Sequence, residues 1–146
     1  MRKLASIQRV KSLEDIERDG VIADNIVLAK FEDVAWQCVV KRGEFNVGDF
    51  AVYIEVSTVL PQVEVFAWMD ARKYKVKTQK IFGALSQGLS LPVSILKSFG
   101  VEEWAINNVE VGDDVTDIIG VMRIEDAEPP KLSGEQKGLF PTYLVP

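Results

Sequence analysis

Positively charged side chains cluster in one short stretch of a chain that is acidic as a whole. Residues 71–80 read ARKYKVKTQK, whereas the 146 residues together have a formal net charge of −5. If this stretch is one extended strand, alternate side chains point to the same face, about 6–7 Å apart. That spacing roughly matches the phosphates of a nucleic-acid backbone. The side chains predicted to share this face are Lys73, Lys75, Lys77 and Gln79.

Arg72 and Lys80 flank this predicted lysine face and add to its charge. Tyr74 would point the other way, where its ring could stack on a base or pack inside the fold. The same lysines also have a structural explanation, because lysines on an exposed edge strand prevent sheets from pairing with one another. The residues alone leave both explanations open.

Two further segments carry candidate phosphate ligands. Ser86 and Gln87 lie in a bend bracketed by glycines, where backbone amides and the Gln87 side chain could meet a phosphate. A tight corner that needs glycine explains the same pattern. Lys41 and Arg42 end a predicted strand and could join a binding face, although a solvated hairpin tip accounts for them equally well.

The aromatic and acidic residues are assigned mostly structural roles. The three tryptophans are expected to pack in the core or against helices, and Tyr53 is the better candidate for stacking on a base. Residues 102–128 hold nine acidic residues and one base. The spacing of Asp113, Asp114 and Asp117 is unlike that of a calcium loop, so this segment is predicted to be a solvated face.

Several kinds of chemistry are excluded by composition. The chain has no histidine and a single cysteine, Cys38, which removes histidine catalysis and makes a structural zinc site untenable. It has no phosphate-binding GxxxxGK loop, no apolar run of 18 residues and no signal-peptide core. We therefore expect an intracellular, cytoplasmic protein without a membrane span, without a metal or cofactor of its own, and without catalysis by this chain alone.

Short apolar runs separated by glycine-rich turns predict a mainly β fold. The expected turns cover 19–25 and 43–49, short helices follow Pro61 and span 93–100, and a turn at 112–114 precedes a last short element. This pattern predicts an OB-fold-like, five-stranded Greek-key barrel with helical insertions, although a β-sandwich stays possible. Residues 1–126 would form this domain and residues 127–146 a linker or tail. The predicted strands are 25–31, 36–42, 50–57, 73–82 and 86–92.

Three motifs tie the chain to a known family. WQCVVKRGEFNVGD, SQGLSLP and GDDVTDIIGV lie within residues 2–125, which resemble the N-terminal OB domain of ATP-dependent, nick-sealing RNA ligases. The resemblance implies binding of RNA or an RNA-containing duplex beside a nucleotidyltransferase domain, in cis or in trans, that uses ATP and a divalent metal. That domain's Lys-x-Asp-Gly motif is absent here, and Phe82 stands where the family suggests a basic residue.

Two other functions stay open at this point. The stretch that begins with ADNI, residues 23–26, also looks distantly like OB-fold tRNA-binding modules, so a stand-alone tRNA or single-strand binder is one alternative. The other is a protein-interaction module that docks through the apolar VEVFAWM segment, residues 63–69.

Overall fold

Alternating apolar side chains in the first half of the chain produce a curled antiparallel sheet. Along the second strand, for example, Val27, Ala29 and Phe31 are buried and the residues between them are not. The computed structural model describes residues 3–127, and its main sheet has the order β3-β2-β1-β4-β9. The predicted mainly β, OB-like fold is confirmed. The strands are β1 (Ala5–Arg18), β2 (Val21–Phe31), β3 (Gln37–Lys41), β4 (Phe50–Ile54) and β9 (Leu89–Pro92).

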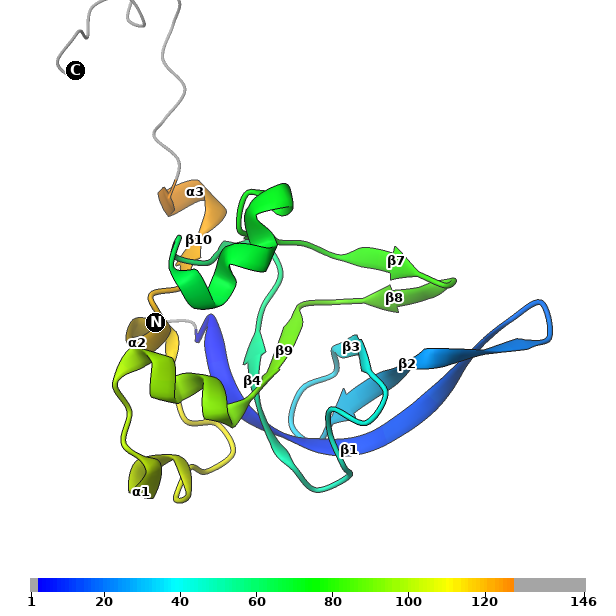
Figure 1. Ribbon diagram of the computed structural model, residues 1–146, viewed down its shortest axis with the longest axis horizontal. Helices are drawn as coiled ribbons and strands as arrows, with labels where there is room; N and C mark the ends of the chain where they lie inside the picture. Colours follow the sequence, from blue (N-terminus) through cyan, green and yellow to red (C-terminus); the bar gives the residue numbers. More distant parts are fainter. Residues whose placement is uncertain (1–2, 128–146) are drawn as a thin grey trace, which may run out of the picture.

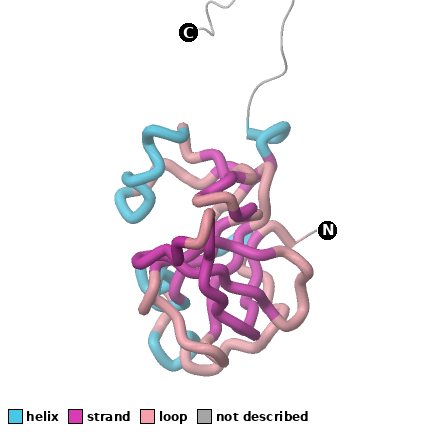
Figure 2. Tube along the Cα trace, turned by 90° about the vertical axis from the view of Figure 1, so that its right-hand side faces the viewer, coloured by secondary structure: helices cyan, strands magenta, loops and turns pink. Residues whose placement is uncertain are grey.

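The curl comes from β1, which pairs with two strands along its length. Its first half pairs with β4 and its second half with β2, with register shifts between Val10 and Ser12 and between Asp15 and Glu17. Such bulges bend a strand and increase its twist. The strands fill the centre of the molecule and the helices lie at its periphery (Figure 2).

Alternate side chains of β4 point to opposite faces, and both of these faces are buried. Val52 and Ile54 belong to the core that the helices cover, and Ala51 and Tyr53 belong to a second core shared with β2 and β3. Tyr53 is only 1% exposed, and its hydroxyl donates to the carbonyl of Gln87 at 2.7 Å. The prediction that Tyr53 stacks on a base is therefore wrong.

The helices are short and pack against the core that contains Val52 and Ile54. Two are 3₁₀ helices, η1 (Glu64–Arg72) and η2 (Val93–Phe99), which confirm the helices predicted there. Gly100 ends η2 in the left-handed conformation, as expected of a C-terminal glycine. The last helices are α1 (Glu103–Ile106), α2 (Thr116–Ile119) and α3 (Ile124–Ala127). Within residues 3–127, no helix has the length and apolar character needed to cross a membrane.

Two hairpins project from the same side of the sheet, away from α1, α2 and α3 (Figure 1). One joins β1 to β2, and the other joins β7 (Gln79–Ile81) to β8 (Ala84–Ser86). Each has a two-residue loop with positive φ at both positions, the geometry of a type I′ turn. The turn predicted over residues 19–25 is accordingly wrong, because Asp19 and Gly20 alone reverse the chain and β2 begins at Val21.

A small three-stranded sheet, in the order β10-β5-β6, joins the last strand to the middle of the chain. It consists of β5 (Thr58–Val59), β6 (Lys75–Val76) and β10 (Met122–Arg123). The helix α3 follows at once. The tail predicted over 127–146 lies outside the described residues apart from Ala127.

Thr116 connects the start of β1 to α2 through hydrogen bonds. Its hydroxyl oxygen accepts hydrogen bonds from the backbone amides of Leu4 and Ala5 at 3.0 and 3.1 Å and donates to the Asp114 carboxylate at 2.6 Å. The hydrogen bonds that the hydroxyl and the backbone amide of Thr116 donate to Asp114 lower the pKa of this carboxyl. Because folding lowers this pKa, the contact stabilises the fold above the unfolded pKa of the carboxyl and is lost as pH falls through the folded value.

Replacing Thr116 by valine is expected to lower the free energy of unfolding by about 2 kcal/mol, since two buried amides lose their acceptor. Urea denaturation measures this change. Thr116→Ser keeps the hydroxyl, so its free energy of unfolding should fall by less than half as much. Equal losses in the two variants would show that the methyl group, and not the hydroxyl, carries the stabilisation.

Candidate nucleic-acid interface

The predicted lysine face does not exist as one strand. Lys73 and Tyr74 adopt left-handed φ angles of 55° and 61°, because Lys73 caps the C-terminus of η1 and its amide donates to Asp70. The chain then forms the short β6 and, two residues later, β7. A strand over 73–82 with Lys73, Lys75 and Lys77 in line is therefore wrong.

The fold nevertheless gathers several of the predicted residues around one cavity of about 300 Å³. Its floor is apolar and includes Val39, Met69 and Leu89. Among the residues that the structure describes, three cations line it and no carboxylate does, which makes it an anion-attracting site in an acidic protein. We call it the basic cavity. Its polar and aromatic lining residues are Trp68, Arg72, Lys75, Lys77, Gln79 and Ser86.

Trp68 is the member of the basic cavity that sequence reasoning missed. Its side chain is 56% exposed, because Phe66 and Met69 fill the buried face of η1. Its indole nitrogen donates to the carbonyl of Val65 at 3.1 Å, which orients the ring. Trp36 and Trp104 are 41% and 67% exposed, so none of the three tryptophans, expected in the core or packed against helices, is a core residue. For Trp68, only the spacing of Phe66, Trp68 and Met69 within the short helix could have indicated that its side chain is exposed.

Ser86 and Gln87 close the barrel between its edge strands, β3 and β9. The Ser86 hydroxyl accepts from the amide of Val39 at 2.9 Å, and the Gln87 amide donates to the carbonyl of Gln37 at 2.7 Å. Ser86 is buried and still lines the basic cavity. The backbone amides at this bend thus hold the fold together, which corrects the idea that they are free to meet a phosphate.

The other predicted residues lie outside the basic cavity. Lys73 is exposed beyond η1, and Lys80 lies on the β7–β8 hairpin opposite Leu85. Lys41 is exposed at the end of β3. Arg42 is used within the fold: its guanidinium donates to Asp15 and to the carbonyls of Ala23 and Asp24, each at 2.9 Å.

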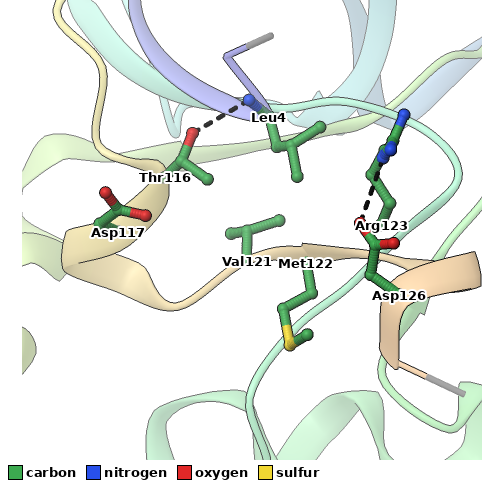
Figure 3. A pocket seen from close by; sticks show the side chains of 7 residues that line it. All are labelled: Leu4, Thr116, Asp117, Val121, Met122, Arg123 and Asp126. Carbon is green, nitrogen blue, oxygen red and sulfur yellow. Dashed lines mark hydrogen bonds and ion pairs between the residues drawn. The ribbon is translucent and has the colours of Figure 1, made fainter. Parts of the chain in front are cut away.

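A second cavity, of about 410 Å³, has the opposite character. It lies between the start of β1, α2 and α3, with Leu4, Val121 and Met122 around an apolar interior (Figure 3). Asp117 and Asp126 stand at its rim, and the guanidinium of Arg123 pairs with Asp126 at 3.3 Å. The charge of this cavity does not suit a phosphate, so positive and negative surfaces are segregated as the sequence predicts.

The remaining candidate ligands have structural roles. The Asp113 carboxylate accepts from the amide of Glu110, and burial raises the pKa of the Cys38 thiol to about 11, which leaves it protonated at neutral pH. Among residues 3–127, no three acidic or cysteine side chains are grouped so as to hold a metal ion.

Comparison with known proteins supports this architecture. A sequence profile describing an OB-fold domain matches residues 4–93. No curated protein sequence matches the chain. Three of the similar solved structures are forms of an RNA ligase from Naegleria gruberi, solved with PPi, as a variant with ATP and Mn, and as a variant with AMP and Mn.

The similarity to the Naegleria ligase covers most of this chain. Sequence identities are 29%, 30% and 29%, with TM-scores of 0.68, 0.67 and 0.67, over 92%, 91% and 90% of this chain. This chain spans little more than a third of the ligase, 37–38% of its length. Because the profile covers more than half of the chain and the curled five-stranded sheet agrees with it, the chain belongs to the OB-fold domain family.

Proposed function

We propose that this chain is a nucleic-acid-binding OB module of an ATP-dependent RNA ligase, and that it holds a nicked RNA-containing duplex for a separate nucleotidyltransferase domain. The observation that carries the proposal is the basic cavity, which the described residues line with three cations, one exposed tryptophan and no carboxylate. The similarity to the Naegleria RNA ligase supports the class of enzyme.

The basic cavity would act through charge and position. Arg72, Lys75 and Lys77 bind backbone phosphates, which gives affinity without reading sequence. The ring of Trp68 packs on a base or sugar exposed at the nick. Holding the two ends in place lets the catalytic domain join them without first ordering them. The second cavity, with Asp117 and Asp126 at its rim, repels phosphates and so disfavours a duplex bound in the opposite orientation.

The chemistry of ligation belongs to the other domain in this proposal. That domain, in cis or in trans, supplies the lysine that takes AMP, and it binds ATP and the divalent metal. This chain contributes the substrate-holding surface and binds neither. Such a role in RNA repair places the protein inside the cell.

The direct test is a titration of fluorescently labelled nicked RNA duplex at several salt concentrations. With three phosphate contacts, log K should fall with log salt with a slope of about −2 to −3. Folded tRNA serves as the competitor. Tighter binding of tRNA than of the nicked duplex would instead support a stand-alone tRNA binder. No binding of either at low salt would refute the proposal and favour a protein-interaction module.

Replacing Trp68 by alanine is expected to weaken binding of the nicked duplex about tenfold, because one aromatic contact to a base is lost. Trp104→Ala is the matched control, since Trp104 is also exposed but does not line the basic cavity. Trp68→Phe should restore most of the affinity. Equal effects of Trp68→Ala and Trp104→Ala, measured by fluorescence anisotropy, would argue against a role for Trp68 in binding.

A further inference from the structure

The tips of the two projecting hairpins meet. A Cβ atom at Gly83 in the β7–β8 loop would lie 3.8 Å from Cδ of Arg18, at the end of β1. Between the tips is a cavity of about 330 Å³ lined by Arg18, Lys80, Phe82 and Gly83. We call it the tip cavity. Its volume is near the lower end of ligand pockets, which hold about 300–1,000 Å³.

The tip cavity and the basic cavity lie on opposite faces of β7. Gln79 and Ile81 line the basic cavity, whereas Lys80, between them, lines the tip cavity. Alternate side chains of a strand point to opposite faces. One hairpin therefore contributes to two separate sites that a single nucleic-acid ligand could reach around its edge.

Phe82 occupies the tip at a conformational cost. Its φ is 51°, in the left-handed region, which disfavours bulky side chains and favours asparagine or glycine in this type of turn. Phe82 is partly buried and belongs to neither hydrophobic core, so core packing does not account for the aromatic ring. Backbone strain at a position outside the core is typical of functional positions.

The charges beside the ring suit a phosphate. Arg18 has a weak ion pair with Asp19, 3.9 Å between Nε and Oδ2, and the two side chains are 61% and 92% exposed. An exposed pair of this kind contributes little, so a phosphate can displace it. Lys80 supplies a second cation on the other hairpin. An aromatic ring and two cations that line one cavity can hold the base and the phosphate of one nucleotide.

We propose that the tip cavity binds one unpaired nucleotide of an RNA substrate, with its base on Phe82 and its phosphate on Arg18 and Lys80. The inference rests on the proposed nucleic-acid-binding function and defines its substrate class. Bases inside a double helix have both faces covered by their neighbours, so away from the nick itself only a flap, bulge or overhang presents a face to Phe82. The preferred substrate is then a nicked duplex that carries an unpaired nucleotide beside the paired region.

The test compares a fully paired nicked RNA duplex with the same duplex carrying a one-nucleotide flap at the nick. The parent protein is expected to bind the flapped duplex about tenfold more tightly, the contribution of one stacked base. Phe82→Asn should abolish this preference, leave affinity for the paired duplex within about twofold, and maintain or raise the melting temperature, since asparagine suits the turn. Phe82→Tyr should retain the preference.

Three further variants examine the charges. Arg18→Ala and Lys80→Ala should each reduce the salt slope by about one unit for the flapped duplex only. Asp19→Asn should strengthen flap binding, because a competing carboxylate is removed. An unchanged flap preference in Phe82→Asn, or no preference in the parent protein, would overturn the inference while paired-duplex binding still stands.

A third ligand separates this inference from the proposed function. Short single-stranded RNA offers unpaired bases without a duplex. If the paired nicked duplex fails to bind but the short strand binds in a Phe82-dependent way, the tip cavity is supported and the ligase-module proposal is refuted. If neither RNA binds, both are wrong.

Discussion

A variant in which Arg72, Lys75 and Lys77 are replaced by alanine is expected to bind nicked RNA duplex about 500-fold more weakly than the parent protein at about 0.1 M salt. Each phosphate contact releases close to one counterion, so at this salt each contributes nearly a factor of ten. The three side chains line one cavity, to which the described part of the chain contributes no carboxylate, and their effects should combine. The slope of log K against log salt should approach zero.

The control for this variant removes the same charge elsewhere. Lys11, Lys97 and Arg123 are exposed and do not line the basic cavity, and Lys97 and Arg123 pair with carboxylates. Their alanine triple variant should change the affinity by only a few fold, through net charge alone. Equal losses in the two triple variants would mean that total charge, rather than the basic cavity, governs binding. Full retention of affinity by the cavity variant would place the binding surface elsewhere.

Regular alternation in the first half of the fold predicted strands that overlap β2, β3 and β4, but β1 was not among the predicted strands and the strand over 73–82 is wrong. Val52 and Ile54 point away from Ala51 and Tyr53, as a period of two requires. The alternation could not show that both faces of β4 are covered. That depends on the helices packing from the second half of the chain, which short-range patterns do not report.

The basic residues were identified from composition, but their geometry was not predictable from alternation. Alternation assumes an extended backbone, and η1 continues to Arg72 before Lys73 and Tyr74 turn the chain in the left-handed conformation. The lysines converge because β6 pairs with β5 and β7 pairs with β8. Such pairings between short strands depend on tertiary contacts that the local sequence hardly specifies.

The resemblance was most informative where a single residue departs from it. Phe82 stands where a basic residue was expected, and in the structure Arg18 of the neighbouring hairpin lies beside it. Positive charge is thus present at the tip, supplied from a distant part of the sequence. No pattern around position 82 could have revealed Arg18, because the meeting of two hairpins is a property of the whole sheet.

The bend at Ser86–Gly88, which closes the barrel between β3 and β9, is called the seam here. Gly88 is expected to be the position in the seam most sensitive to substitution, and Gly88→Ala should lower the free energy of unfolding by about 3 kcal/mol. A Cβ atom there would lie 2.6 Å from the carbonyl oxygen of Ile54 and 2.8 Å from Cε1 of Tyr53. The first is backbone in β4, and the second belongs to a ring whose hydroxyl bonds Gln87, so neither can move without opening the seam. The φ of Gly88, +107°, adds backbone strain to this overlap.

Gly43→Ala isolates the backbone strain, because Gly43 has a similar φ of +91° and a Cβ atom there would meet nothing within 4 Å beyond its immediate chain neighbours. The free energy of unfolding of this variant, measured by urea denaturation, should fall by only about 1 kcal/mol. Since Gly88 and Ser86 line the basic cavity, Gly88→Ala should also weaken RNA binding at temperatures where the protein is still folded. Equal destabilisation by the two substitutions would show that close packing at the seam does not hold the barrel shut. A destabilised Gly88→Ala variant with full RNA affinity would separate the seam from the binding surface.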